Sequence, residues 1–196
     1  MRLIVGLGNP GPEYEWTPHN MGFLALDALA GRAGIRITRP EAKSLVGRGL
    51  ITGHEVVLAQ PQTMMNLSGV AVRMLLERYE ANPAEMIVVL DEIDLPWGML
   101  RIRDKGRNST HNGLKSIIGA IGTDEFLRIR IGVAPEKIWG DRKDYLLCSI
   151  GRNDRQVAEE SVIAAAEAVE SVLTEGAAKA MSRFNRKVEA EEESSS

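Results

Sequence analysis

The sequence predicts a single α/β domain, with one sheet flanked by helices. Short apolar or β-branched runs alternate with segments whose apolar residues have helical spacing. The chain has 196 residues, of which 44% are hydrophobic and 26% charged, enough to bury the core of one ordinary domain. No Pro-rich or Ser-rich linker interrupts the first part of the chain, so we expect one domain over residues 1–188.

Six segments are predicted to be strands because each is short, apolar or β-branched, and bounded by Gly, Pro or charge. They are residues 3–5, 45–51, 56–59, 86–90, 99–103 and 127–133. Apolar residues with helical spacing predict helices over residues 21–30, 69–79, 114–121, 154–173 and 178–184. Gly176 is expected to end the long fourth helix.

The ends of the chain and its one cysteine bear on the compartment. The start MRLIVGLGNPG has no long apolar run before a small-residue cleavage site, so neither secretion nor membrane insertion is expected. Cys148 can form no internal disulfide, and DYLLCSIG predicts a buried strand in which the thiol packs. We therefore expect a cytosolic protein. Residues 189–196, EAEEESSS, are predicted to be a disordered acidic tail.

The net charge of −3 argues against a protein whose whole surface is basic. Ten of the 24 basic residues nevertheless form two groups along the chain, and either group could meet phosphates or belong to an ordinary solvated surface. The first group is Arg101, Arg103, Lys105, Arg107 and Lys115, and the second is Arg128, Arg130, Lys137, Arg142 and Lys143.

A glycine-rich segment, from Gly6 to Gly11, follows the first predicted strand with the spacing of a dinucleotide-binding loop. That mechanism needs a helix to open at the third glycine, whereas Pro12 and Pro18 keep this chain extended or turning. We therefore expect a tight loop that places Asn9 at the carboxyl end of the strand, where open α/β sheets bind ligands.

A histidine and a carboxylate follow two different predicted strands. His19 lies in Thr17-Pro18-His19-Asn20 just before a helix, and Asp91 opens the segment DEID after the strand over residues 86–90. His19 alone would be an ordinary capping or surface residue. If the strand ends converge, however, the imidazole can take a proton from water while the carboxylate fixes its tautomer.

The sequence gives less support to a site that uses a side-chain nucleophile or a metal ion. The sequence has no nucleophile-elbow motif for serine or cysteine, so water is the expected nucleophile. His19, His54 and His111 show no close ligand spacing along the chain, so no metal site is expected.

Two further segments, MMNLSG over residues 64–69 and HNGLK over residues 111–115, carry amides just before predicted helices. Ser68 or Asn112 could simply cap the helix that follows, and the methionines could simply pack. Together with Asn9, Asn66 and Asn112 suggest a polar, uncharged site that can bond amide or ribose groups.

These segments resemble the bacterial-type peptidyl-tRNA hydrolase family. The matching stretches are GLGNPGPEYEWTPHNMGF, MMNLSG, LDEIDLP, THNGLK, RIRIGV and AMSRFN, in this order over nearly the whole chain. The resemblance implies an esterase that releases peptide from tRNA, with a mixed twisted sheet, no cofactor and a monomeric state. It also implies roles for particular residues: His19 as base, Asp91 as its partner, and Asn9, Tyr14, Met65, Asn66 and Asn112 in substrate binding.

Several positions depart from the family pattern. Pro18 replaces the usual Arg, Met64 the usual Phe, Ala134-Pro135-Glu136 the usual Gly-Arg-Pro, and residues 105–110 a glycine-rich run. Lys105, Arg107 and Lys115 are the expected tRNA contacts. Two rival hypotheses are an RNA-binding protein of the same fold that has lost catalysis, and a nucleotide-cofactor enzyme that uses the glycine loop.

Overall fold

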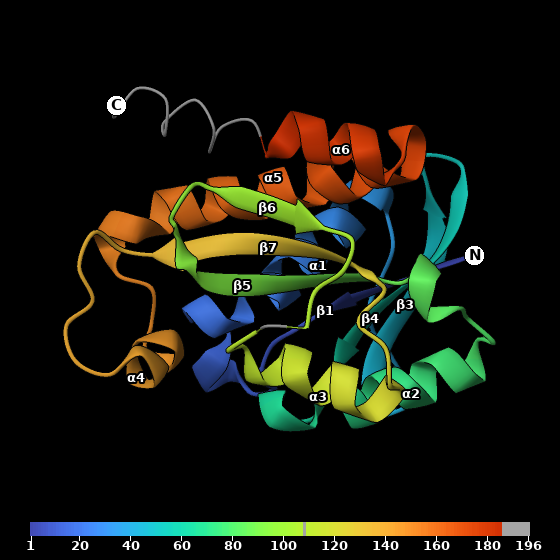
Figure 1. Cartoon of the computed structure of the whole chain (residues 1–196), viewed down its shortest axis with the longest axis horizontal. Helices are drawn as coiled ribbons and strands as arrows, with labels where there is room; N and C mark the ends of the chain where they lie inside the picture. Colours follow the sequence, from blue (N-terminus) through green and yellow to red (C-terminus); the bar gives the residue numbers. More distant parts are fainter. Residues whose placement is uncertain (108, 186–196) are drawn as a thin grey trace.

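The computed structural model describes residues 1–107 and 109–185, which form one α/β domain around a twisted mixed sheet (Figure 1). The strands in the described residues are β1 (Arg2–Gly6), β2 (Arg39–Glu41), β3 (Ser44–Ile51), β4 (His54–Pro61), β5 (Ile87–Pro96), β6 (Leu100–Arg103) and β7 (Leu127–Ala134). Their order in the sheet is β2-β3-β4-β1-β5-β7-β6. The four central strands are parallel, and antiparallel strands complete both edges.

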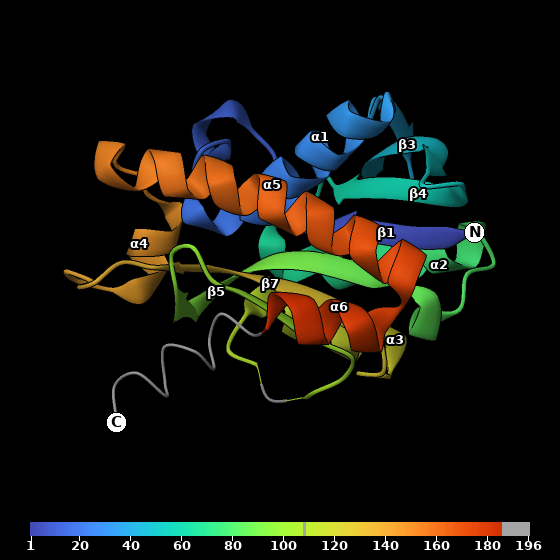
Figure 2. The same ribbon diagram turned by 90° about the horizontal axis from the view of Figure 1, so that it is seen from above.

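Helices cover both faces of the sheet. They are α1 (Met21–Ala33), α2 (Ser68–Arg78), α3 (Asn112–Ile121), α4 (Arg142–Leu147), α5 (Arg152–Glu175) and α6 (Ala177–Phe184). Short 3₁₀ turns are η1 (Pro12–Tyr14), η2 (Pro18–Asn20), η3 (Met65–Leu67) and η4 (Pro83–Glu85). Helices α5 and α6 lie on one face with α1, and α2 and α3 lie on the other (Figures 1 and 2).

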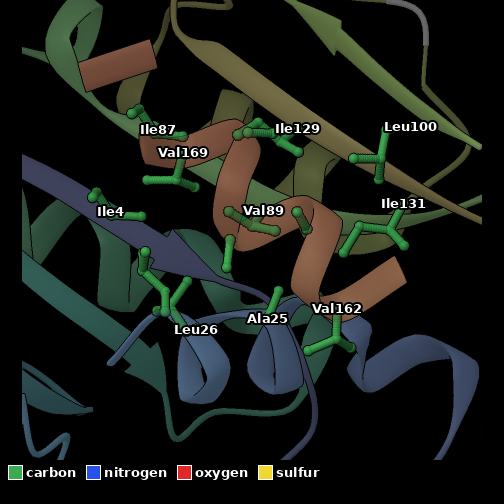
Figure 3. Close-up of a cluster of buried hydrophobic side chains, with 14 of the residues drawn as sticks. Ile4, Ala25, Leu26, Ile87, Val89, Leu100, Ile129, Ile131, Val162 and Val169 are labelled. Carbon is green, nitrogen blue, oxygen red and sulfur yellow. The ribbon is translucent and has the colours of Figure 1, made fainter. Parts of the chain in front are cut away.

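The two faces bury two separate apolar layers because side chains alternate along each strand. Ile4 of β1 packs with α1 and α5, whereas Leu3 and Val5 pack with α2 and α3. Figure 3 shows the first layer, in which Val162 and Val169 of α5 lie over strand residues such as Ile129 and Ile131. Both layers are closed by helices, so ligand access is left to the strand ends.

One close backbone approach fixes α1 against the sheet. A Cβ on Gly22 would lie 2.3 Å from the Val89 carbonyl oxygen and 2.6 Å from the Leu7 backbone nitrogen and oxygen. A larger residue there would force the start of α1 away from β1 and β5. This glycine therefore brings the turn that precedes α1 directly to the end of β5.

Two predictions about local structure are wrong. The strand predicted to stop at residue 90 continues to Pro96, because β5 stays paired with β7 through Glu92 and again at Pro96. Cys148 is exposed and follows α4, not a buried strand, because the preceding residues form a helical turn capped by Asp141. The predicted tail at 189–196 lies outside the described residues. No helix within 1–107 and 109–185 is long and apolar enough to cross a membrane.

Candidate active site

Polar side chains converge at the carboxyl ends of the central parallel strands. From this edge α1 leaves toward one face of the sheet, while α2 and α3 leave toward the other. The loops after β1 and β4 meet β5 here, and such a reversal is where open α/β sheets form their ligand crevice.

His19 and Asp91 meet in this crevice as the sequence predicts. His19 Nδ1 lies 2.8 Å from Asp91 Oδ2, and both side chains are buried, with 10% and 1% of their surface exposed. His19 lies in η2, three residues before Gly22, and Asp91 follows Val89 in β5 by two residues. The close contact of Gly22 with Val89 therefore sets the position of the pair.

Burial and hydrogen bonding act against each other at both groups. Burial lowers the pKa of His19, but the charge and hydrogen bond of Asp91 outweigh it and raise that pKa above 6.5. Burial raises the pKa of Asp91, but its two imidazole neighbours outweigh that effect and hold it well below its usual range. Asp91 is therefore ionised at neutral pH, and its hydrogen bond leaves His19 Nε2 as the nitrogen available to a substrate.

A second histidine completes the group, and its spacing along the sequence did not indicate this place. His111 Nε2 lies 2.7 Å from Asp91 Oδ1, and the two imidazole centroids are 4.8 Å apart. The absence of close spacing along the chain concealed this proximity, because the ring contact joins η2 to the start of α3. The segment THNGLK was a usable signal, since it places a histidine just before a helix that follows β5.

The three side chains also form a grouping that can hold a metal, since the nearest donor atoms lie within 4.8 Å of one another. In the present geometry both carboxylate oxygens accept hydrogen bonds from the imidazoles at 2.7 and 2.8 Å. Those distances fit N–H donors that carry protons, whereas a metal needs lone pairs turned toward one point. The geometry therefore fits a proton-transfer site.

Asn9 is held in a fixed orientation beside the pair. Asn20 Oδ1 accepts from the Asn9 amide at 2.8 Å, Asn20 Nδ2 donates to the Asn9 carbonyl, and Met65 N donates to Asn9 Oδ1 at 2.7 Å. These contacts turn the Asn9 Nδ2 donor toward the remaining space. The glycine loop thus serves to place Asn9, and α1 begins only at Met21, too late to offer a pyrophosphate its N-terminal amides.

The amides of Asn66 and Asn112 are exposed, and their side chains make no hydrogen bond within the described part of the chain. Tight packing holds them, because Gly69 of α2 touches Ser116 of α3 and its amide donates to Ser116 Oγ at 2.9 Å. Met65 is buried, and a Cβ on Gly113 would lie 2.5 Å from its sulfur.

The capping alternatives for these segments are wrong. His111 caps α3, and the Ser68 hydroxyl donates to the Met65 carbonyl instead of accepting a helix amide. Tyr14 lies half-buried in η1, where its carbonyl accepts from the Thr17 hydroxyl.

Four arginines form a row beside this crevice on β6 and β7. Arg101 is opposite Arg130 and Arg103 is opposite Arg128, on the sheet face away from α5. Buried guanidinium nitrogens of Arg101, Arg128 and Arg130 find no partner among the described residues. Arg128 is fully buried, and burial first, then the charge of Arg130, lower its pKa to about 10.

This arginine row joins members of both basic groups of the sequence. They are not among the tRNA contacts expected from the sequence, although the pattern Leu-Arg-Ile-Arg, present in both strands, indicates four arginines on one face. The predicted contacts Lys105, Arg107 and Lys115 are all exposed, and Arg107 pairs with Asp124 at 3.6 Å. Asn108 of the same loop lies outside the described residues.

A hollow of about 370 Å³ lies beside Arg130 of the arginine row. It is lined by Glu92, Asp94, Ser109, Thr110 and Arg130. Its lining residues Glu92 and Thr110 are the chain neighbours of Asp91 and His111.

An ionised carboxylate that orients a histidine, with amide donors beside it, defines a hydrolytic enzyme of the general-base class. Comparison with known proteins gives the family. The model for peptidyl-tRNA hydrolase matches residues 3–193. The chain is 50% identical over 190 residues to the peptidyl-tRNA hydrolase of Koribacter versatilis, covering 96% of this chain and 94% of that one. It is 45% identical over 187 residues to that of Solibacter usitatus, with 95% of each chain covered.

A solved structure agrees with this assignment. The crystal structure of peptidyl-tRNA hydrolase from Acinetobacter baumannii superposes with a TM-score of 0.86 at 33% identity, covering 94% of each chain. The chain described here belongs to the peptidyl-tRNA hydrolase family.

Proposed function

We propose that this protein hydrolyses the ester between a peptide and tRNA, releasing tRNA for reuse in translation. The observation that carries the proposal is the hydrogen bond from His19 Nδ1 to the buried carboxylate of Asp91, which leaves Nε2 free as a base. The family membership supports the same substrate.

The chemistry follows from the available groups. His19 Nε2 takes a proton from water as the water oxygen attacks the ester carbonyl, and Asp91 stabilises the imidazolium. The tetrahedral oxyanion then collapses, the bond to the ribose oxygen breaks, and His19 returns the proton to that oxygen. The products are tRNA with a free terminal hydroxyl and a peptide carboxylic acid, which loses its proton to solvent and leaves as the carboxylate.

The fixed amide of Asn9 and the free amides of Asn66 and Asn112 position the substrate. A peptide attached to tRNA carries a neutral amide beside the ester, whereas an aminoacyl-tRNA carries an α-amino group with a reference pKa of about 7.7 to 8.0. Side-chain amides can pair with the first group, and sites built for such bonds discriminate by up to roughly 10⁴ to 10⁵ against substrates that lack them.

The acceptor end of the tRNA is placed along the arginine row and the hollow beside it. Arg103 is exposed and Arg101 and Arg130 are half-buried, so their guanidinium groups can donate to phosphate oxygens, which accept such hydrogen bonds in pairs. Arg128 is fully buried and supports the row from beneath. Lys105, Arg107 and Lys115 add charge from the neighbouring loop and helix. The overall charge of −3 leaves these local groups as the attraction for RNA.

We place the enzyme in the cytosol, where translation supplies its substrate, and expect it to act as a monomer. The resemblance to the peptidyl-tRNA hydrolase family carries the expectation of a monomer. Light scattering coupled to gel filtration checks this expectation, and a stable dimer at assay concentrations contradicts it.

The test is incubation of the purified protein with N-acetyl-aminoacyl-tRNA, with and without a chelator, followed by measurement of free tRNA. We expect turnover that the chelator does not change, and little cleavage of the unblocked form. Binding without release would instead support the RNA-binding rival. Equal cleavage of blocked and unblocked forms would leave a general tRNA esterase and refute the proposed role of the amides.

A further inference from the structure

Asp91 is held by two imidazoles, not one, and the proposed reaction uses only the first. Resting on the proposed function, we propose that His111 is a positioning residue: a neutral hydrogen-bond donor that holds Asp91 so that its other oxygen orients His19. The contacts of His111 itself carry this inference.

The hydrogen bonds of His111 define its tautomer. Its Nδ1 accepts the backbone amides of Gly113 at 3.1 Å and Leu114 at 3.3 Å, at the start of α3. A nitrogen that accepts two amides carries no proton, so the ring proton is on Nε2. That proton points to Asp91 Oδ1 at 2.7 Å. Protonating Nδ1 would break both capping bonds.

Histidine is an unusual choice for this helix cap. Ser, Thr, Asp and Asn are the preferred residues at such positions, and any of them would satisfy the first amides of α3. None of them extends from the cap to the carboxylate as an imidazole does. The second contact, to Asp91, therefore accounts for the residue type.

Two consequences follow for the catalytic pair. With Oδ1 bound by His111 and Oδ2 by His19, the carboxylate cannot rotate away from the base. The donated N–H also disperses part of the Asp91 charge and so limits how strongly Asp91 favours the imidazolium. The other charged groups near the end of β5 are paired elsewhere, Glu92 with Arg130 and Asp94 with Arg142.

The two functions of His111 can be separated by substitution. In His111→Asn the side-chain oxygen still caps α3, but the shorter side chain no longer reaches Asp91. We expect kcat to fall by roughly 10- to 100-fold. This is the range for losing a residue that orients a functional group without itself touching the substrate. The acid limb of the pH–rate profile should move to higher pH, because Asp91 then favours protonated His19 more strongly.

His111→Gln provides the matched comparison, since its amide nitrogen lies in about the place of imidazole Nε2. We expect it to restore part of kcat and bring the acid limb back toward that of the wild type, with a lower Tm from loss of the cap. His54→Asn is the control, because His54 is exposed at the start of β4. The kcat and the pH–rate profile of this variant should match those of the wild type.

An NMR measurement tests the tautomer without activity. Nitrogen-15 chemical shifts of the wild-type protein at neutral pH should show that Nε2 of His111 is protonated and that Nδ1 is not. The inference is overturned by the opposite tautomer, or if folded His111→Asn keeps both kcat and the acid limb, or if it raises KM alone. A wild-type protein that cleaves no N-acetyl-aminoacyl-tRNA would overturn the proposed function itself and leave the tautomer result standing.

Discussion

The buried pair of His19 and Asp91 differs from the arginine row in how completely its charged groups are hydrogen-bonded within the protein. Around Asp91 both carboxylate oxygens are hydrogen-bonded within the protein, and the carboxylate is 1% exposed. Along β6 and β7, buried nitrogens of three arginines have no partner among the described residues, and Arg128 is fully buried. Burying a cation with incomplete pairing costs stability.

In the proposed function this difference separates the chemical step from substrate capture. A group that must move a proton at one position gains from partners that the fold supplies in advance. A group that must hold a phosphate instead needs donors that the substrate can reach, and Arg103 of the row is exposed. Substitutions in the first region should therefore lower kcat, and those in the second should raise KM.

The largest effect is expected at the base. His19→Ala should fold normally but lower kcat by at least roughly 10²-fold, with KM little changed, because the change removes the imidazole that takes the proton from water. Steady-state release of tRNA from N-acetyl-aminoacyl-tRNA measures this. An unchanged rate would remove His19 from the chemistry.

Asp91→Asn should lower kcat by roughly 10²-fold or more, because the amide keeps the shape but loses the charge that supports the imidazolium. Asp94→Asn is the matched control, since Asp94 is exposed and paired with Arg142. If Asp94→Asn loses activity while Asp91→Asn does not, Asp94 and not Asp91 is the partner of His19.

The double change Arg103→Ala and Arg130→Ala should raise KM roughly 10-fold or more with kcat nearly unchanged. Each lost phosphate contact should also lower the slope of log KM against log salt by about 0.7 to 0.9. Lys105→Ala with Arg107→Ala should act in the same direction, while Lys179→Ala, exposed on α6 of the opposite face, should have no effect. A fall confined to kcat would place the arginine row in the chemical site.

The smallest effect is expected from the amides. Asn66→Ala or Asn112→Ala should narrow the preference for the N-acetylated substrate by roughly 3- to 10-fold, the equivalent of one neutral hydrogen bond. Competition between blocked and unblocked substrates measures the ratio. Equal losses with both substrates would show that these amides do not bind the acylated nitrogen.

The sequence is a good guide where periodicity decides the structure. All six predicted strands and five predicted helices exist, and His19 and Asp91 meet because the ends of parallel strands share one edge. The edge strand β2 and the short α4 were not predicted, since three and six residues give little periodic signal. Cys148 was misplaced for the same reason.

The missed features depend on contacts between distant segments. His111 reaches Asp91 because α3 packs closely against Met65 in the folded structure. The arginine row needs β6 and β7 to pair in the register that places Arg103 opposite Arg128. Alternation in either strand alone is consistent with an ordinary solvated surface.

The pH dependence of kcat/KM in the wild type and in Asp91→Asn tests the central claim most directly. Because Asp91 raises the pKa of His19 and the base must be neutral, wild-type activity should fall as the pH decreases through a value above 6.5. In Asp91→Asn only burial, which lowers the pKa, remains, so the acid limb should move to lower pH while the maximal rate falls. An acid limb that stays in place would contradict a His19 base oriented and charged by Asp91.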